Sequence, residues 1–222
     1  AILSGDSMLV LAYDRMAQCD DKHLAKVMKL FTTTALEIGE GQQYDMEFEA
    51  RTDVTIGEYM EMIRLKTSVL LAGAARIGAV MGDADERNAN ALYDFAVNLG
   101  LAFQLADDLL DVVGSSRNTG KPVGGDIREG KRTVLLADAL SAADTADKAD
   151  LIAIFEADCR NDNQVARTIE LFTSTGALDR SRERIAALWG ESRKAIAGLE
   201  LNSEAQRRLT EACARFVPES LR

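Results

Sequence analysis

Three aspartates in one apolar stretch are the residues of this sequence best suited to binding a metal ion. Residues 101–114 read LAFQLADDLLDVVG, and Asp107, Asp108 and Asp111 lie there among leucine, valine and phenylalanine. On a helix Asp107 and Asp111 share a face, about 6 Å apart along the axis. Two carboxylates at that distance repel by about 3 kcal/mol at an effective dielectric constant near 20. We therefore expect a neutralising cation, and ligands that are all oxygens favour Mg²⁺ over Ca²⁺ or Mn²⁺. The alternative is a helix rim whose aspartates pair with lysines.

A segment rich in glycine and lysine follows this predicted helix. Residues 114–131, GSSRNTGKPVGGDIREGK, contain five glycines and a proline, which predicts a long loop. Lys121 and Lys131 lie among glycines that let backbone amides approach an anion closely. Gln104 lies one turn before Asp107 on the same face. Carboxylates, a metal ion and a cationic loop together predict a diphosphate site, in which the metal screens the carboxylates from the phosphates. The alternative for the lysines is an ordinary solvated loop.

Helical periodicity runs through almost the whole chain, without an alternating strand pattern, an internal repeat or a domain linker. We expect one all-α domain over residues 1–222, a helical bundle. Thr55 and Glu58 form a capping-box pattern at the start of one helix. Asp20 and Asp21 can cap the start of the helix expected at 21–51, and another helix begins near Asp85. The expected helices are at about 1–19, 21–51, 55–82, 85–113, 133–143, 147–158, 163–175, 177–198 and 203–216.

Composition excludes several classes of function. A formal charge of −10 argues against binding nucleic acid or an anionic membrane, and it requires a cation to mediate contact with any anionic ligand. A single histidine, His23, excludes His-based zinc sites and Ser-His-Asp triads. No apolar run is long enough to span a membrane. Cys19, Cys159 and Cys213 are far apart and unpaired in pattern, which is typical of reduced thiols in a cytoplasmic protein.

Five motifs in order resemble the trans-prenyl diphosphate synthase family. DDLLD with the downstream TGKPVGGDIREGKRT is similar to the family's second aspartate-rich motif and its loop. AILSGDSMLVLA, GQQYD, LKTSVLLAGAARIGA and the Phe-Gln pair of FQLADDLLD resemble its other elements. The resemblance implies a class I isoprenoid synthase fold, a large helical bundle around a central cavity. It also implies a short-chain, homodimeric prenyltransferase of isoprenoid biosynthesis, such as a farnesyl or geranylgeranyl diphosphate synthase. Such an enzyme condenses isopentenyl diphosphate with dimethylallyl, geranyl or farnesyl diphosphate through a carbocation and releases diphosphate.

The same resemblance implies which residues bind the metal ions and the leaving group. Three Mg²⁺ ions are implied for each active site, with Mn²⁺ as a substitute. Asp107 would bind the third ion directly, and Asp108 and Asp111 would act mainly through its water shell. Lys66 and Lys121 would be catalytic residues that hold the allylic diphosphate.

Further residues are implied to surround the substrates. Lys131 would bind diphosphate from nearby, and Thr67 and Gln104 would place oxygens beside the carbocation. Gln42 and Asp45 would line the same cavity. The alternatives are that Thr67 bonds back to a helix carbonyl, and that Gln42 and Asp45 are surface residues of a long helix.

The sequence also departs from the family pattern. The family's first aspartate-rich motif and the arginines after it are absent, and Asp20-Asp21 is no substitute because it lacks the later aspartate. We therefore expect this to be the C-terminal two-thirds of a longer protein, inactive by itself. Leu70 stands where some short-chain members carry tyrosine, and the product length is left open.

Three alternative functions remain to be weighed. A non-catalytic or regulatory subunit of a heteromeric prenyl synthase would also lack the first motif, although it would not need Lys66 or Asp107. A terpene cyclase or squalene-type synthase usually carries a different second metal motif. A four-helix di-iron protein needs a Glu-x-x-His pattern that is absent.

Overall fold

The protein folds entirely from helices in the residues that its computed structural model describes, 2–114, 123–199 and 201–221, as the sequence predicts. None of the helices in those ranges is long and apolar enough to cross a membrane. The elements are α1 (Ile2–Met16), α2 (Asp21–Phe48), α3 (Ile56–Ile63), the π-helical η1 (Arg64–Ser68), α4 (Val69–Met81), α5 (Glu86–Val113), α7 (Gly125–Glu129), α8 (Val134–Ala142), α9 (Thr145–Glu156), α10 (Asp162–Ser174), α11 (Ala177–Ala197), α12 (Ser203–Cys213) and the 3₁₀ turn η2 (Glu219–Leu221).

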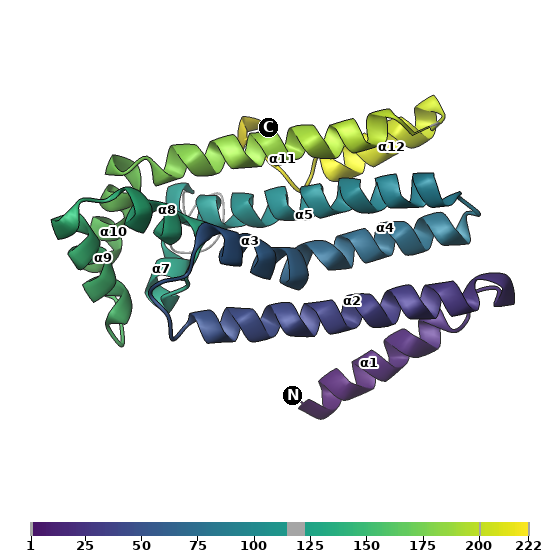
Figure 1. The fold of residues 1–222 in the computed structure, drawn as a ribbon, viewed down its shortest axis with the longest axis horizontal. Helices are drawn as coiled ribbons and strands as arrows, with labels where there is room; N and C mark the ends of the chain where they lie inside the picture. Colours follow the sequence, from purple (N-terminus) through teal and green to yellow (C-terminus); the bar gives the residue numbers. More distant parts are fainter. Residues whose placement is uncertain (1, 115–122, 200, 222) are drawn as a thin grey trace.

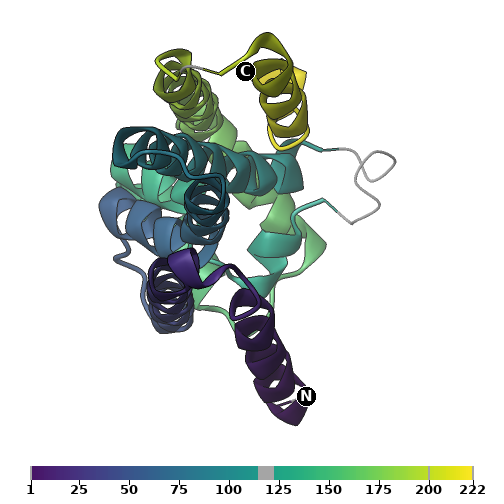
Figure 2. The same ribbon diagram turned by 90° about the vertical axis from the view of Figure 1, so that its right-hand side faces the viewer.

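Long helices lie side by side and form the body of the bundle. Helix α5 packs between α4 and α11, and α2 packs against α4 and η1 (Figure 1). The short helices α7 to α10 gather at one end of these long helices. Helix α1 diverges from α2 and projects from the bundle, as the view along the helices shows (Figure 2). The long helices and the short helices thus meet at one end of the bundle.

Helix α5 is central because its sequence buries one broad apolar face. Leu105, Leu109 and Ala102 are completely buried, and Leu99 and Val112 are nearly so. Their spacing of three or four residues places them on one side of the helix. Burial of each leucine stabilises the fold by about 1.5–3 kcal/mol. This packing fixes the rotation of α5 about its axis, and with it the directions of the aspartates near its end.

Two helices that were predicted to begin near Thr55 and Asp85 have side-chain caps at these residues. Thr55 and Glu58 form the complete capping box, and the Asp85 side chain accepts from the Asn88 amide at the start of α5. Asp20 occupies the N-cap position of α2, but its side chain makes no capping hydrogen bond. The prediction that it caps this helix by its side chain is therefore wrong.

The segment predicted as a loop over 114–131 contains a short helix. Helix α7 lies between Gly124 and Gly130, which both have positive φ values, 77° and 75°. Residues with a Cβ rarely adopt that conformation, so the two glycines set the beginning and the end of α7. This helix brings Asp126 and Lys131 to the end of α5.

Candidate active site

A pocket of about 100 Å³ lies where α2, α3, η1 and α5 meet the segment around α7. Five acidic and three basic side chains belong to this part of the described structure. The pocket is lined by Asp45, Phe48, Glu49, Tyr59, Met62, Ile63, Lys66, Thr67, Gln104, Asp107, Asp108, Asp126, Lys131, Arg132 and Thr133. Most of the polar residues predicted for the site therefore share one cavity.

Lys66 and Thr67 lie on η1, a π-helical turn where the sequence predicts uninterrupted α-helix. Single π turns inside α-helices are frequent at functional sites. Two glycines let neighbouring helices approach this turn closely. A Cβ on Gly41 of α2 would lie 2.4 Å from Lys66 N, and a Cβ on Gly100 of α5 would lie 2.6 Å from Ser68 Cα. Close packing from both sides thus holds the turn that presents Lys66 and Thr67.

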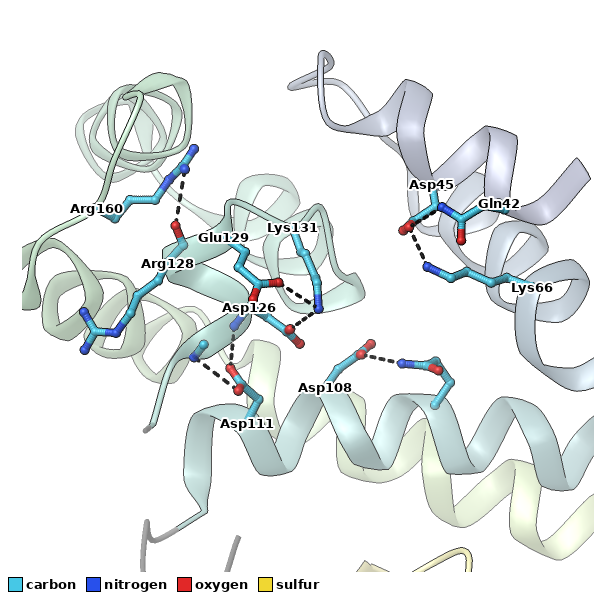
Figure 3. A network of polar contacts seen from close by, with 12 residues as sticks. Gln42, Asp45, Lys66, Asp108, Asp111, Asp126, Arg128, Glu129, Lys131 and Arg160 are labelled. Carbon is cyan, nitrogen blue, oxygen red and sulfur yellow. Dashed lines mark hydrogen bonds and ion pairs between the residues drawn. The ribbon is translucent and has the colours of Figure 1, made fainter. Parts of the chain in front are cut away.

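Lys66 is paired with an acidic residue of the neighbouring helix α2. Its Nζ lies 2.5 Å from Oδ2 of Asp45 on α2 (Figure 3). Gln42, one turn earlier on α2, is exposed and donates to the same oxygen over 3.4 Å. Gln42 does not line the described pocket, whereas Asp45 does. Of these two predicted cavity residues, only Asp45 is in the cavity wall.

Thr67 and Gln104 are joined in a hydrogen-bond chain that ends on Asp108. Thr67 Oγ1 donates to Gln104 Oε1 over 3.1 Å, so Thr67 does not simply bond back to its own helix. Gln104 Nε2 donates to Asp108 Oδ1 over 3.0 Å. The hydroxyl of Tyr59, on α3, donates to the other carboxylate oxygen of Asp108. Three helical elements thus converge on one buried carboxylate.

Burial controls the chemistry of Asp108. Its side chain is 3% exposed, and this burial raises the pKa of Asp108 to about 7, against the lowering effect of the hydrogen bonds from Tyr59 and Gln104. Burial and the charge of Asp108 also raise the pKa of Tyr59 well above its usual value. Because both oxygens of Asp108 already accept hydrogen bonds, its immediate role in this structure is to organise neighbouring side chains.

Asp111 anchors the start of α7. Its Oδ1 accepts from the Gly125 amide over 3.1 Å, and its Oδ2 accepts from the Asp126 amide over 3.0 Å (Figure 3). Burial raises the pKa of Asp111, although these amide hydrogen bonds lower it. Asp111 is not part of the pocket lining. The last aspartate of the predicted motif therefore ties α5 to the segment that carries Asp126 and Lys131.

Asp126 and Tyr59 are site residues that the sequence analysis missed. Asp126 Oδ1 lies 2.6 Å from Lys131 Nζ, and this contact raises the pKa of Lys131 above its usual value despite partial burial, which lowers it. Asp126 lies among glycines, eight residues before the apolar helix α8 begins at Val134, and its position carried no metal or anion pattern of its own. Tyr59 lies 49 residues from Asp108, so only the tertiary structure reveals their contact.

Asp107 is the carboxylate best placed to bind a metal ion. It is exposed at the edge of the pocket, and no hydrogen bond or ion pair joins it to another described residue. No group of three His, Cys, Asp or Glu side chains within the described ranges could hold a metal by itself. Mg²⁺ usually takes one or two carboxylates and completes its shell with water and substrate phosphates. The residues present fit such an ion, with Asp107 as the protein ligand. Lys121 lies outside the described residues.

Comparison with known proteins decides the family. The family model described as polyprenyl synthetase matches residues 1–172. The chain belongs to this family. A short chain isoprenyl diphosphate synthase of Methanocaldococcus jannaschii is 40% identical over 172 residues, which cover 77% of this chain and 52% of that protein. The chain spans about half the length of such curated relatives, 52–58% for three of them.

Solved structures of other family members have the same fold. A geranylgeranyl pyrophosphate synthetase from Pyrococcus horikoshii is 34% identical, with a TM-score of 0.91 over 98% of this chain and 66% of that one. A geranylgeranyl pyrophosphate synthase from Corynebacterium glutamicum, solved with isoprenyl diphosphate and magnesium, is 30% identical, with a TM-score of 0.89 over 97% of this chain and 62% of that one. The predicted isoprenoid synthase fold is confirmed.

Proposed function

We propose that this family member carries the diphosphate-activating part of a Mg²⁺-dependent prenyltransferase. The reaction joins an allylic diphosphate, such as dimethylallyl, geranyl or farnesyl diphosphate, to isopentenyl diphosphate and releases diphosphate. The resemblance to short-chain isoprenyl diphosphate synthases supports this substrate class. By the same resemblance the proposal includes a homodimer, which light scattering of the purified protein would test.

The charge balance of the pocket is the observation that carries the proposal. Lys66 and Lys131 can contact an anion there, but Asp45 and Asp126 already pair with them. The third basic residue of the pocket, Arg132, donates from its guanidinium to backbone carbonyls, among them those of Gly130 at 2.8 Å and Phe155 at 3.1 Å. With acidic side chains in excess, a bare diphosphate would be repelled. A diphosphate accompanied by divalent cations suits this pocket.

Each described residue then has a defined task. Asp107 would hold Mg²⁺, which when bound neutralises charge on the departing diphosphate. Lys66 and Lys131, from opposite sides of the pocket, would donate to the outer phosphate oxygens. Electrostatic stabilisation by groups fixed in advance lowers the barrier to ionisation because the protein does not need to reorganise.

The pocket also offers oxygens where positive charge would develop. Thr67 and Gln104 line it and are joined through Oγ1 and Oε1, while Met62 and Ile63 supply apolar wall. Neutral oxygens stabilise a nearby carbocation without attacking it, and apolar walls exclude the water that would. Proton loss would follow to the released diphosphate, by analogy with the family, so no enzyme nucleophile is required.

The proposal is tested by a condensation assay on the complete gene product. Isopentenyl diphosphate with each allylic diphosphate is expected to give a longer prenyl diphosphate with Mg²⁺ and none with EDTA. Asp107→Ala is expected to lower kcat by at least 100-fold. Asp94→Ala is the matched control, because Asp94 is exposed on the same helix about 20 Å away.

Two results would contradict the proposal in different ways. Wild-type protein that condenses none of these substrates contradicts the enzymatic function and leaves the non-catalytic subunit as the better account. Full activity of Asp107→Ala contradicts the assignment of Asp107 as the metal ligand.

A further inference from the structure

The buried hydroxyl of Tyr59 has no part in the mechanism above, yet it reaches the centre of the site. Tyr59 and Asp108 are each 3% exposed, and the hydroxyl donates directly to the Asp108 carboxylate. A buried carboxylate without hydrogen bonds is costly. Only two side chains in the described structure, Tyr59 and Gln104, donate to Asp108. The Tyr59 hydroxyl therefore supplies one of the two hydrogen bonds that offset the cost of burying this carboxylate.

We infer that Tyr59 is a positioning residue, which acts through Asp108 to fix the orientation of the Gln104 amide and, through that amide, the Thr67 hydroxyl. This inference rests on the proposed function, since it assigns the two oxygens to the reacting end of the substrate. Tyr59 itself is not required to touch the substrate.

The argument starts from the amide of Gln104, which has a donor end and an acceptor end. A carboxylate only accepts, so Asp108 selects the orientation in which Gln104 Nε2 faces it at 3.0 Å. Gln104 Oε1 must then face Thr67 Oγ1, 3.1 Å away. If the amide turned over, its NH₂ group would occupy the place where the proposed mechanism needs an oxygen.

Tyr59 determines which oxygen of Asp108 is left for Gln104. With Oδ2 occupied by the tyrosine hydroxyl, the carboxylate presents Oδ1 to Gln104. Without that hydroxyl, Oδ2 has no donor among the described side chains, Gln104 alone holds the carboxylate, and the amide loses a fixed partner. The tyrosine ring lies in the hydrophobic core, so its packing is separable from the effect of its hydroxyl.

The test is Tyr59→Phe, which keeps the ring and removes only the hydroxyl. We expect kcat for condensation to fall 10- to 100-fold while KM for both diphosphates changes less than threefold. In a Gln104→Ala background, Tyr59→Phe is expected to lower kcat less than threefold further, because residues that act as a unit are not additive. Tyr93→Phe is the control, since Tyr93 lies on α5 about 20 Å from Asp107 and outside the pocket.

A second measurement does not depend on activity. In wild-type protein labelled with ¹⁵N-glutamine, one side-chain amide proton of Gln104 is expected to exchange slowly with solvent. The Gln104→Ala variant identifies this signal by its disappearance. Rapid exchange of both amide protons would overturn the inference.

The outcomes separate this inference from the proposed function. A wild-type protein without condensation activity overturns the proposed function. An active wild type whose Tyr59→Phe variant keeps its kcat overturns the inference alone. The inference is also overturned if the loss of kcat in the double variant equals the product of the two single losses, because Tyr59 would then act independently of Gln104.

Discussion

Lys66 of η1 and Asp45 of α2 form an ion pair with 2.5 Å between Nζ and Oδ2, in the wall of the candidate active site. Both side chains are only partly exposed, 36% and 28%. A second pair, Lys131 with Asp126, lies on the other side of Asp108 (Figure 3). Lys66 and Lys131, the described lysines proposed to bind diphosphate, are thus each held by a carboxylate until a ligand competes for them.

Asp45→Asn is expected to strengthen metal-free binding of inorganic pyrophosphate roughly three- to tenfold, because it removes one negative charge beside the phosphates and releases Lys66. Isothermal titration calorimetry in EDTA measures this. Asp53→Asn is the control, since it removes the same charge from an exposed residue outside the pocket. Unchanged or weaker binding in Asp45→Asn would show that this ion pair does not restrain Lys66.

Gly100→Ala is expected to destabilise the protein by about 1–3 kcal/mol, because the added methyl group overlaps Ser68 and must displace η1. Condensation activity should fall with it, since η1 carries Lys66 and Thr67. Gly78→Ala in α4 is the matched control. A Cβ there meets nothing within 4 Å, so the free energy of unfolding of this variant should rise by about 0.5–1 kcal/mol. Urea denaturation measures both, and equal effects would contradict the packing argument.

Asp108 is expected to make stability depend on pH between about 4 and 7. Its folded-state pKa of about 7 lies above the ordinary value of 3.8, so in this range the folded state binds more protons than the unfolded state. This contribution to stability is present at low pH and is lost as the pH rises through 7. The shift corresponds to about 4 kcal/mol as an order of magnitude.

Asp108→Asn removes this titration and should therefore be more stable than wild type at pH 8, although less active. Its amide oxygen can still accept from Tyr59, and its NH₂ group can donate to Gln104 once the Gln104 amide turns over, so each buried partner keeps a hydrogen bond. The measurement is the difference in unfolding free energy between variant and wild type from pH 4 to 8, in EDTA. A difference that stays constant over this range would contradict the raised pKa.

Asp111→Ala is expected to loosen the attachment of α7 to α5, because the Gly125 and Asp126 amides lose their acceptor and only the bond from Gly124 N to the Asp111 carbonyl remains at this point. The cost should be about 1–3 kcal/mol, and hydrogen exchange at these two amides should accelerate. Diphosphate binding should weaken as Asp126 and Lys131 shift. Asp94→Ala on the same helix should change none of these properties. Exchange rates equal to those of wild type would show that α7 is held in another way.

Local sequence signals predicted most of the helical framework. The capping box at Thr55 and the cap at Asp85 mark helix starts because side chain and amide are three residues apart. Asp20 carries the same local signal without the hydrogen bond. Helix α7 was missed because a five-residue helix between two glycines has no periodicity to detect.

The arrangement inside the site was less predictable, because it depends on contacts between distant residues. The π turn at Lys66 packs closely against Gly41 and Gly100 on two other helices. The sequence of residues 64–68 carries no pattern that predicts this turn. The aspartate motif lies on the helix predicted for it, but its three carboxylates have three different environments. Asp107 is open to the pocket, Asp108 is buried, and Asp111 binds backbone amides. Spacing alone cannot distinguish these environments.

Binding of inorganic pyrophosphate, titrated with and without Mg²⁺, tests the central claim most directly, since it requires neither a second substrate nor turnover. The account predicts that wild-type protein binds at least tenfold more tightly with Mg²⁺ than in EDTA, and that Asp107→Ala loses this gain while Asp94→Ala keeps it. Equal affinity with and without Mg²⁺, or an undiminished gain in Asp107→Ala, would contradict a metal-mediated diphosphate site in this pocket.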